Sequence, residues 1–294
     1  MTSRAGSGWF FIIFTGVMFG SLGLCTSYLT SQGVSPFVCA AIPFTLTALL
    51  ALTIGWRRLG EVPWGEGLAL GAVNGGIPPL LFNIGFAELP ASVVTIVLAL
   101  GPLFTALTAH LAFHDDRFNG AKVGGMAVSF VGVALLAGAP TGSASGWLLV
   151  VVLVGTIVSG ASLVWVRRMA AGHDPLSVLP AMMLGAAIVS VLVSVATGNA
   201  PWLVEATVGQ LWLLAGMGAA GVATFLGSLK ANEINPASRA GLMGYVVPLV
   251  GVLGGVLLFK ETLSFSLLGG GALVIAGVAL VGRANRTVAP VLSG

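Results

Sequence analysis

Residues 74–83, NGGIPPLLFN, place hydrogen-bonding groups inside an otherwise apolar stretch. Asn74, Pro78 and Phe82 recur every four residues, so a helix would carry them on one face, and Asn83 adds a second amide. The two consecutive prolines lack backbone donors and would make a helix irregular. If this stretch crosses a membrane, irregular backbone belongs where it is buried in protein or lines a water-filled cavity. The segment is therefore predicted to be a cavity wall that offers hydrogen bonds to a small molecule; the alternative is that the amides join neighbouring helices.

Small polar and aromatic side chains at helical spacing occur in further apolar stretches, and we expect them to face the same cavity. The serine hydroxyls could instead serve close packing between helices, and the tryptophan could lie at a membrane interface. A buried phenol needs a hydrogen-bond partner, which a bound molecule or water could provide. The candidates are Ser21 and Tyr28 in one stretch, Ser159, Ser162 and Trp165 in a second, and Tyr245 in a third.

Pro102 and Pro248 occupy matching positions in two apolar stretches of similar sequence. A proline inside a helix removes a backbone hydrogen bond and kinks the helix. Kinks at equivalent places in two halves of a protein suit hinges, and we predict that role for these prolines. The alternative is a pair of fixed bends that shape the bundle.

Groups that could do covalent chemistry are scattered along the chain. The sequence contains no nucleophile–base pair, metal-ligand cluster, Gly-rich nucleotide loop or HExxH motif, so we expect neither an enzyme nor an ATP-driven pump, and no cofactor or metal. All nine carboxylates fall in expected loops or near the ends of apolar stretches, which argues against a proton relay at mid-membrane. His110 is the one candidate for coupling to protons, and a hydrogen-bonded structural histidine is its alternative.

The elements that must position these residues are membrane-spanning helices. The chain is 57% hydrophobic and 7% charged, whereas a soluble domain is about 25% charged. Its apolar runs are each near the ~20 residues that a helix needs to cross a bilayer. This composition predicts an all-α integral membrane protein. The net charge of +3 reflects basic residues in membrane-flanking loops, and we expect no binding to nucleic acid.

Glycines, prolines and charged clusters divide the chain into ten predicted spans. With the N-terminus in the cytoplasm, eleven of the twelve Lys and Arg residues fall on the cytoplasmic side, Arg167 and Arg168 among them, and Lys260 alone falls outside. Such a bias predicts that both termini are cytoplasmic. The spans are about 9–30, 36–56, 66–86, 91–112, 121–138, 146–167, 175–197, 208–229, 237–259 and 265–283.

The chain contains a repeat. The segment that begins PASVVTIV at Pro90 recurs, 146 residues later, as PASRAGLM at Pro236. Because the repeat unit holds five spans, the second copy must enter the membrane from the opposite side. We therefore predict two inverted repeats, residues 1–145 and 146–294, around a pseudo-two-fold axis in the membrane plane. The best-matched positions are Pro102 with Pro248, Phe113 with Phe259, Asp115 with Glu261, and Gly124-Gly125 with Gly270-Gly271.

With these features, the chain resembles the drug/metabolite transporter superfamily of the EamA type, and within it the YddG-type amino-acid and metabolite exporters of bacterial inner membranes. The resemblance covers the whole chain and is carried by the ten spans and the pattern P-A-S, P, F-x-[DE], G-G, G-V-A-L at the end of each half. It implies a central cavity lined mainly by the first, third, fourth, sixth, eighth and ninth spans, with the fifth and tenth packed behind.

The expected function is export of a small metabolite, above all a neutral or aromatic amino acid, across a bacterial inner membrane by alternating access. One alternative is a sugar-phosphate or nucleotide-sugar antiporter of the same superfamily, which would need Lys or Arg inside the spans; only Lys230 and Arg239 come close. Another is a membrane receptor or structural subunit that moves no solute. The expected partners are the solute and the lipid bilayer, with no obligatory protein partner.

Overall fold

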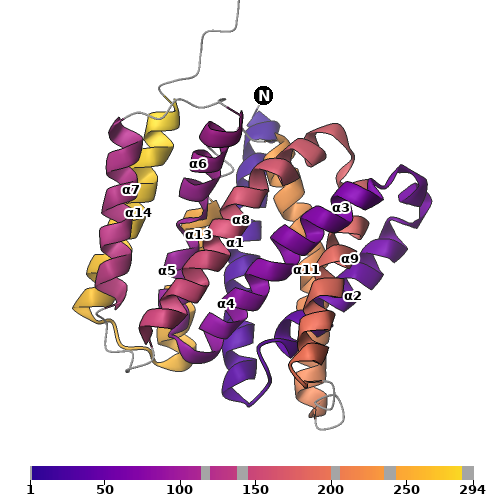
Figure 1. Ribbon diagram of the computed structural model, residues 1–294, viewed down its shortest axis with the longest axis horizontal. Helices are drawn as coiled ribbons and strands as arrows, with labels where there is room; N and C mark the ends of the chain where they lie inside the picture. Colours follow the sequence, from indigo (N-terminus) through magenta and orange to yellow (C-terminus); the bar gives the residue numbers. More distant parts are fainter. Residues whose placement is uncertain (1, 114–119, 138–144, 200–205, 235–242, 287–294) are drawn as a thin grey trace, which may run out of the picture.

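The computed structural model describes residues 2–113, 120–137, 145–199, 206–234 and 243–286, and these residues form helices joined by short turns (Figure 1). In the first half the helices are α1 (Thr2–Ser31), α2 (Val38–Ile54), the 3-10 helix η1 (Trp56–Glu61), α3 (Trp64–Leu70), the π-helix η2 (Gly71–Gly76), α4 (Ile77–Glu88), α5 (Ala91–Leu98), α6 (Gly101–Phe113) and α7 (Gly120–Ala137). In the second half they are α8 (Ser145–Gly172), α9 (Pro175–Ala196), α11 (Val208–Ile234), α13 (Met243–Phe259) and α14 (Phe265–Arg286).

Within the described part of the chain, six helical segments are long and apolar enough to cross a membrane. Each of the six coincides with a span expected from the sequence, which confirms an all-helical protein built from membrane-crossing segments. Four shorter apolar helices lie within the other expected spans. The six are Gly8–Ser31, Trp64–Glu88, Ala91–Ala112, Gly146–Met169, Pro175–Ala196 and Val208–Ala231, and the shorter four are Val38–Ile54, Gly120–Leu136, Met243–Phe259 and Phe265–Val281.

The core is centred on α5, whose side chains are buried on nearly every side. Val94 and Val97 are fully buried in a cluster that joins α5 and α6 to α1, α4, α8 and α14. A helix that is apolar all round belongs in the interior of a bundle. A second cluster joins α2, α9, α11 and the C-terminal part of α8.

Helices α7 and α14 stand side by side at one edge of the bundle and pack through glycines (Figure 1). A Cβ atom on Gly132 would lie 2.6 Å from the carbonyl oxygen of Gly270, and one on Gly125 would lie 2.7 Å from that of Gly277, so any larger residue would push the backbones apart. An offset of 145 residues, one fewer than the offset that aligns Pro90 with Pro236 and Gly125 with Gly271, carries Gly125 to Gly270 and Gly132 to Gly277. The two contacts therefore exchange when the halves of the chain are exchanged.

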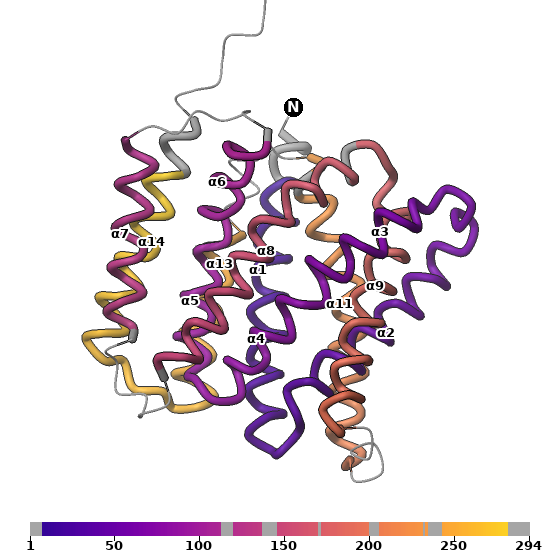
Figure 2. The backbone as a smooth tube through the Cα atoms, viewed as in Figure 1, coloured from indigo at the N-terminus to yellow at the C-terminus, as the bar shows by residue number. Residues whose placement is uncertain are grey.

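The irregularity expected at the two prolines is confirmed, but it widens the helix and does not break it. Pro78 and Pro79 occupy the first turn of α4, and the preceding turn is π-helical, with the Ile77 N–H bonded to the carbonyl of Ala72 five residues earlier. Figure 2 shows the backbone running without interruption from α3 to α4. Because π-turns inside helices are rare and often mark functional sites, this segment is a candidate functional site.

Candidate functional site

Asn74 connects the π-helical segment to α8. Its side-chain nitrogen donates to the hydroxyl oxygen of Ser162 at 2.8 Å and to the carbonyl oxygen of Ser159 at 3.2 Å. The Ser162 hydroxyl in turn donates to the carbonyl of Val158 at 2.7 Å. The structure therefore brings together three of the residues that the sequence nominated, from the first and second halves of the chain.

The side-chain oxygen of Asn74 takes no part in these contacts. Among the described residues none donates a hydrogen bond to it, and it is not one of the buried atoms without a partner. An amide held by its nitrogen thus presents an accessible acceptor at a fixed orientation. Such an acceptor can receive a hydrogen bond from an ammonium, hydroxyl or amide group.

Asn83 lies apart from this cluster. Its side chain is buried, and its nitrogen donates to the carbonyl of Pro36 at 3.1 Å, which ties α4 to the turn before α2. The two asparagines are nine positions apart, which corresponds to about 13 Å along a helix. Pro78 and Phe82 share the helix face of Asn74, and the Phe82 ring packs against Gly155 of α8. That face is thus in contact with α8.

The two nominated aromatic residues near the helix surfaces point elsewhere. Trp165 is 40% exposed and continues the exposed apolar row of Val150, Val154 and Ile157 on α8, whereas Ser162 is buried. Tyr28 is 51% exposed. An exposed apolar row on a membrane helix suits contact with lipid, and the interfacial alternative for Trp165 fits this position. Ser21 is partly buried on α1.

The two prolines at matching positions have different surroundings. Pro248 is buried inside the continuous helix α13, whereas Pro102 lies in the first turn of α6, directly after the break between α5 and α6. A Cβ atom on Gly244 would lie 3.2 Å from the Pro102 ring, so the two helices meet there. Tyr245, the next residue, is partly buried against the core cluster around α5. Their hinge role stays a prediction.

Glu261 was paired with Asp115 in the sequence repeat but was not nominated as a site residue, and in the structure it joins the two halves. It follows α13, and its carboxylate accepts hydrogen bonds from the backbone N–H groups of Ala91 at 2.7 Å and Ser92 at 3.3 Å and from the Ser92 hydroxyl. A carboxylate at a helix N-terminus satisfies free N–H groups and complements the helix dipole. The available signal was the pairing of Asp115 with Glu261 and the repeated P-A-S; Asp115 and residues 236–238 lie outside the described part of the chain.

Arg167 and Arg168 lie at the end of the predicted span 146–167, on the side that the sequence assigns to the cytoplasm. Helix α8 continues past both residues to Gly172, and Arg167 falls within the membrane-compatible segment Gly146–Met169. Arg168 is exposed, whereas Arg167 is partly buried and its Nε atom is buried without a hydrogen-bond partner. Counting charges on either side of a membrane cannot show which of two adjacent arginines turns inward, because that depends on the rotation of the helix.

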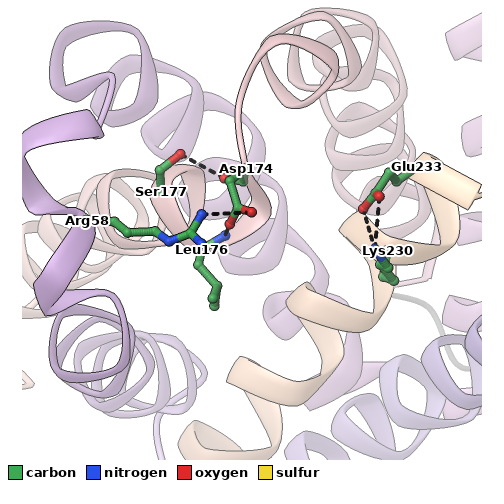
Figure 3. Close-up of polar contacts among 6 residues, drawn as sticks. All are labelled: Arg58, Asp174, Leu176, Ser177, Lys230 and Glu233. Atoms are coloured by element: carbon green, nitrogen blue, oxygen red, sulfur yellow. Dashed lines mark hydrogen bonds and ion pairs between the residues drawn. The ribbon is translucent and has the colours of Figure 1, made fainter.

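Two ion pairs of the described residues lie near the ends of helices. Arg58 of η1 forms an ion pair with Asp174 at 2.8 Å, and Asp174 also caps α9 by accepting from the Leu176 N–H (Figure 3). Both side chains are 42% exposed, as expected for a surface pair of small energetic value. A second pair, Lys230 with Glu233, lies within α11. His110 lies partly buried on α6. Among the described residues, no group of three potential ligands could hold a metal ion.

Apolar helices long enough to cross a bilayer, joined by polar contacts between spans, define a polytopic membrane protein. The sequence model of the EamA-like transporter family matches this chain twice, at residues 6–138 and 146–283. The chain belongs to that family, which makes it a membrane transporter.

Similar proteins agree with this assignment. An uncharacterized transporter of Archaeoglobus fulgidus is 24% identical over 279 residues, which cover 92% of this chain and 96% of the relative. A probable terminal-alkyne amino-acid exporter of Streptantibioticus cattleyicolor is 29% identical over 271 residues, covering 90% of this chain and 85% of the relative. A crystal structure with 20% identity superposes with a TM-score of 0.67, covering 98% of this chain and all of the other, and supports the fold.

Proposed function

We propose that this protein is a secondary transporter that exports small metabolites, above all neutral or aromatic amino acids, by alternating access. The observation that carries the proposal is the Asn74 contact. A polar group of the first half bonds to α8 of the second half, at a π-turn and between apolar helices, and its amide oxygen accepts no hydrogen bond from the described residues. Neutral amides and hydroxyls suit a neutral or zwitterionic solute, because a fully charged solute would require a counter-charge.

The proposed architecture is ten membrane-spanning helices in two inverted repeats, residues 1–145 and 146–294, with both termini cytoplasmic in a bacterial inner membrane. Its support is threefold: the family model matches each half, the glycine contacts of α7 and α14 exchange under a 145-residue offset, and the ten predicted spans would place eleven of the twelve Lys and Arg residues on one side. In such transporters solute binds near the midplane between repeats, and the halves rock around it.

The choice of an amino acid draws on the relative in Streptantibioticus cattleyicolor, whose name describes an amino-acid exporter. A transporter of phosphate-bearing solutes is the second candidate, and Arg167 favours it, since this class needs a cation inside a span. A receptor or structural subunit is the third, and it would move no solute.

Uptake into proteoliposomes tests the proposal. The protein is reconstituted, and separate samples receive radiolabelled Thr, Met, Phe or a sugar phosphate, or no solute. Each sample is measured with and without an imposed pH gradient. We expect saturable uptake of at least one neutral amino acid, down its own gradient, with little effect of pH, because the described spans offer no carboxylate relay. Uptake of the phosphate ester alone would favour the second candidate, and no uptake of any solute the third. Strict dependence on the pH gradient, abolished by His110→Ala, would contradict the uncoupled mechanism.

A further inference from the structure

Arg167 is a cation inside the membrane-compatible part of α8, and among the described residues no hydrogen-bond or ion-pair partner is found for it. Neither ion pair of the described residues includes it, and its buried Nε donates to nothing. Leaving a charged donor desolvated and unpaired is costly, so such groups are retained where something else pairs with them. The planar guanidinium matches carboxylate and phosphate groups, to which it can donate two parallel hydrogen bonds.

The rotation of α8 turns Arg167 toward the interior. Residues four and seven positions earlier share its face, and these are Leu163 and Gly160. Leu163 packs against the apolar cluster of α2, α9 and α11, and the carbonyl of Gly160 accepts a hydrogen bond from the Thr105 hydroxyl of α6 at 2.9 Å. Arg167 therefore shares the face of α8 that packs against α6 and this cluster, which is a different face from the exposed Trp165 row.

Helix α8 carries both Arg167 and the Asn74 contact. Ser162 lies five residues before Arg167, about 7.5 Å along the helix axis. With the topology proposed above, Arg167 stands on the cytoplasmic side of that contact, where a solute bound for export would enter. We propose that Arg167 binds the acidic group, carboxylate or phosphate, of the transported solute on the cytoplasmic side of the site. This inference rests on the proposed transport function and adds that the solute must carry an acidic group.

Binding to matched pairs of molecules tests this role. Dissociation constants are measured for phenylalanine against phenylalaninamide, and for glycerol 3-phosphate against glycerol, on purified protein in phosphatidylcholine nanodiscs. The acidic member of at least one pair is expected to bind tenfold or more tightly. Arg167→Gln should weaken its binding by about ten- to a hundred-fold, the effect of losing charge-assisted hydrogen bonds, and leave the neutral member unchanged. Arg168→Gln, which removes a neighbouring exposed charge, should preserve the ratio.

The proposal is overturned if Arg167→Gln leaves both ratios unchanged, or if it weakens acidic and neutral members alike, as a merely structural residue would. If the variant does not fold, the wild-type protein decides: equal affinity for acidic and neutral members of both pairs refutes the proposal, and Arg167→Lys should show an intermediate ratio.

Two further outcomes separate the proposed anion site from amino-acid export and from lipid binding. If phenylalanine fails to bind but the phosphate pair shows the dependence on Arg167, amino-acid export is wrong and the anion site stands. If Arg167→Gln abolishes stabilisation by added phosphatidylglycerol without changing either solute ratio, the arginine binds lipid headgroups and the proposal is wrong.

Discussion

At the scale of single residues, the Asn74 amide uses its two ends differently: the nitrogen joins η2 to α8, and the oxygen accepts no hydrogen bond from any described residue. Asn74→Ala removes both, and we expect the initial rate of solute uptake to fall by about tenfold or more. The two lost inter-helix hydrogen bonds should lower the free energy of unfolding by only about 1–2 kcal/mol, since such bonds average about 0.6 kcal/mol each in a membrane protein. Uptake by proteoliposomes and thermal unfolding in detergent are compared on the same preparations. Thr47→Val is the control, because it removes a buried inter-helix bond from Thr47 of α2 to Gly218 of α11, two helices that carry none of the nominated site residues. If both variants lose uptake in proportion to stability, Asn74 is only a structural link.

At the scale of elements, the N-terminus of α5 depends on a residue 169 positions later: Glu261 accepts from Ser92 and Ala91 across the two halves of the chain. Glu261→Ala leaves those backbone donors unpaired in the buried core helix, and the unfolding free energy should fall by about 1–3 kcal/mol. Glu261→Gln keeps an acceptor but loses the charge that favours a helix N-terminus, so its effect should be smaller. Denaturation followed by circular dichroism measures the unfolding free energy of both variants.

Glu88→Gln, at an exposed carboxylate at the end of α4, is the matched control and should change the unfolding free energy little. Equal stability of all three variants would show that this cap contributes nothing measurable.

At the scale of the whole molecule, the proposed ten-span topology makes a definite claim about sidedness. Single cysteines are introduced at positions 58, 168 and 260 after Cys25 and Cys39 are replaced. A membrane-impermeant thiol reagent should label positions 58 and 168 from the cytoplasm and position 260 from outside, because Lys260 is the one basic residue assigned to the outer face. Whole cells and inverted vesicles give the two directions of access. Labelling of 58 or 168 from outside would contradict the assignment of the spans.

The sequence by itself determined that this protein is helical, lies in a membrane, and has its helices where the apolar runs fall. It also disclosed the repeat and led to the EamA family. These conclusions follow from hydrophobicity and length, which are local properties of the chain: a run of about 20 apolar residues has few alternatives to a helix in lipid. The π-turn before Pro78 was likewise predictable in kind, because consecutive prolines cannot supply backbone donors.

Only the tertiary structure decided which side chains meet. It placed Asn74 on Ser162, separated Asn83 from both, brought Glu261 to Ser92, and turned Arg167 inward and Arg168 outward. The physical reason is the rotation of each helix about its axis. In a soluble protein, polar and apolar faces reveal that rotation, but these helices are apolar nearly all round, so their orientation is set by close packing between helices distant in sequence, such as the glycine contacts of α7 with α14.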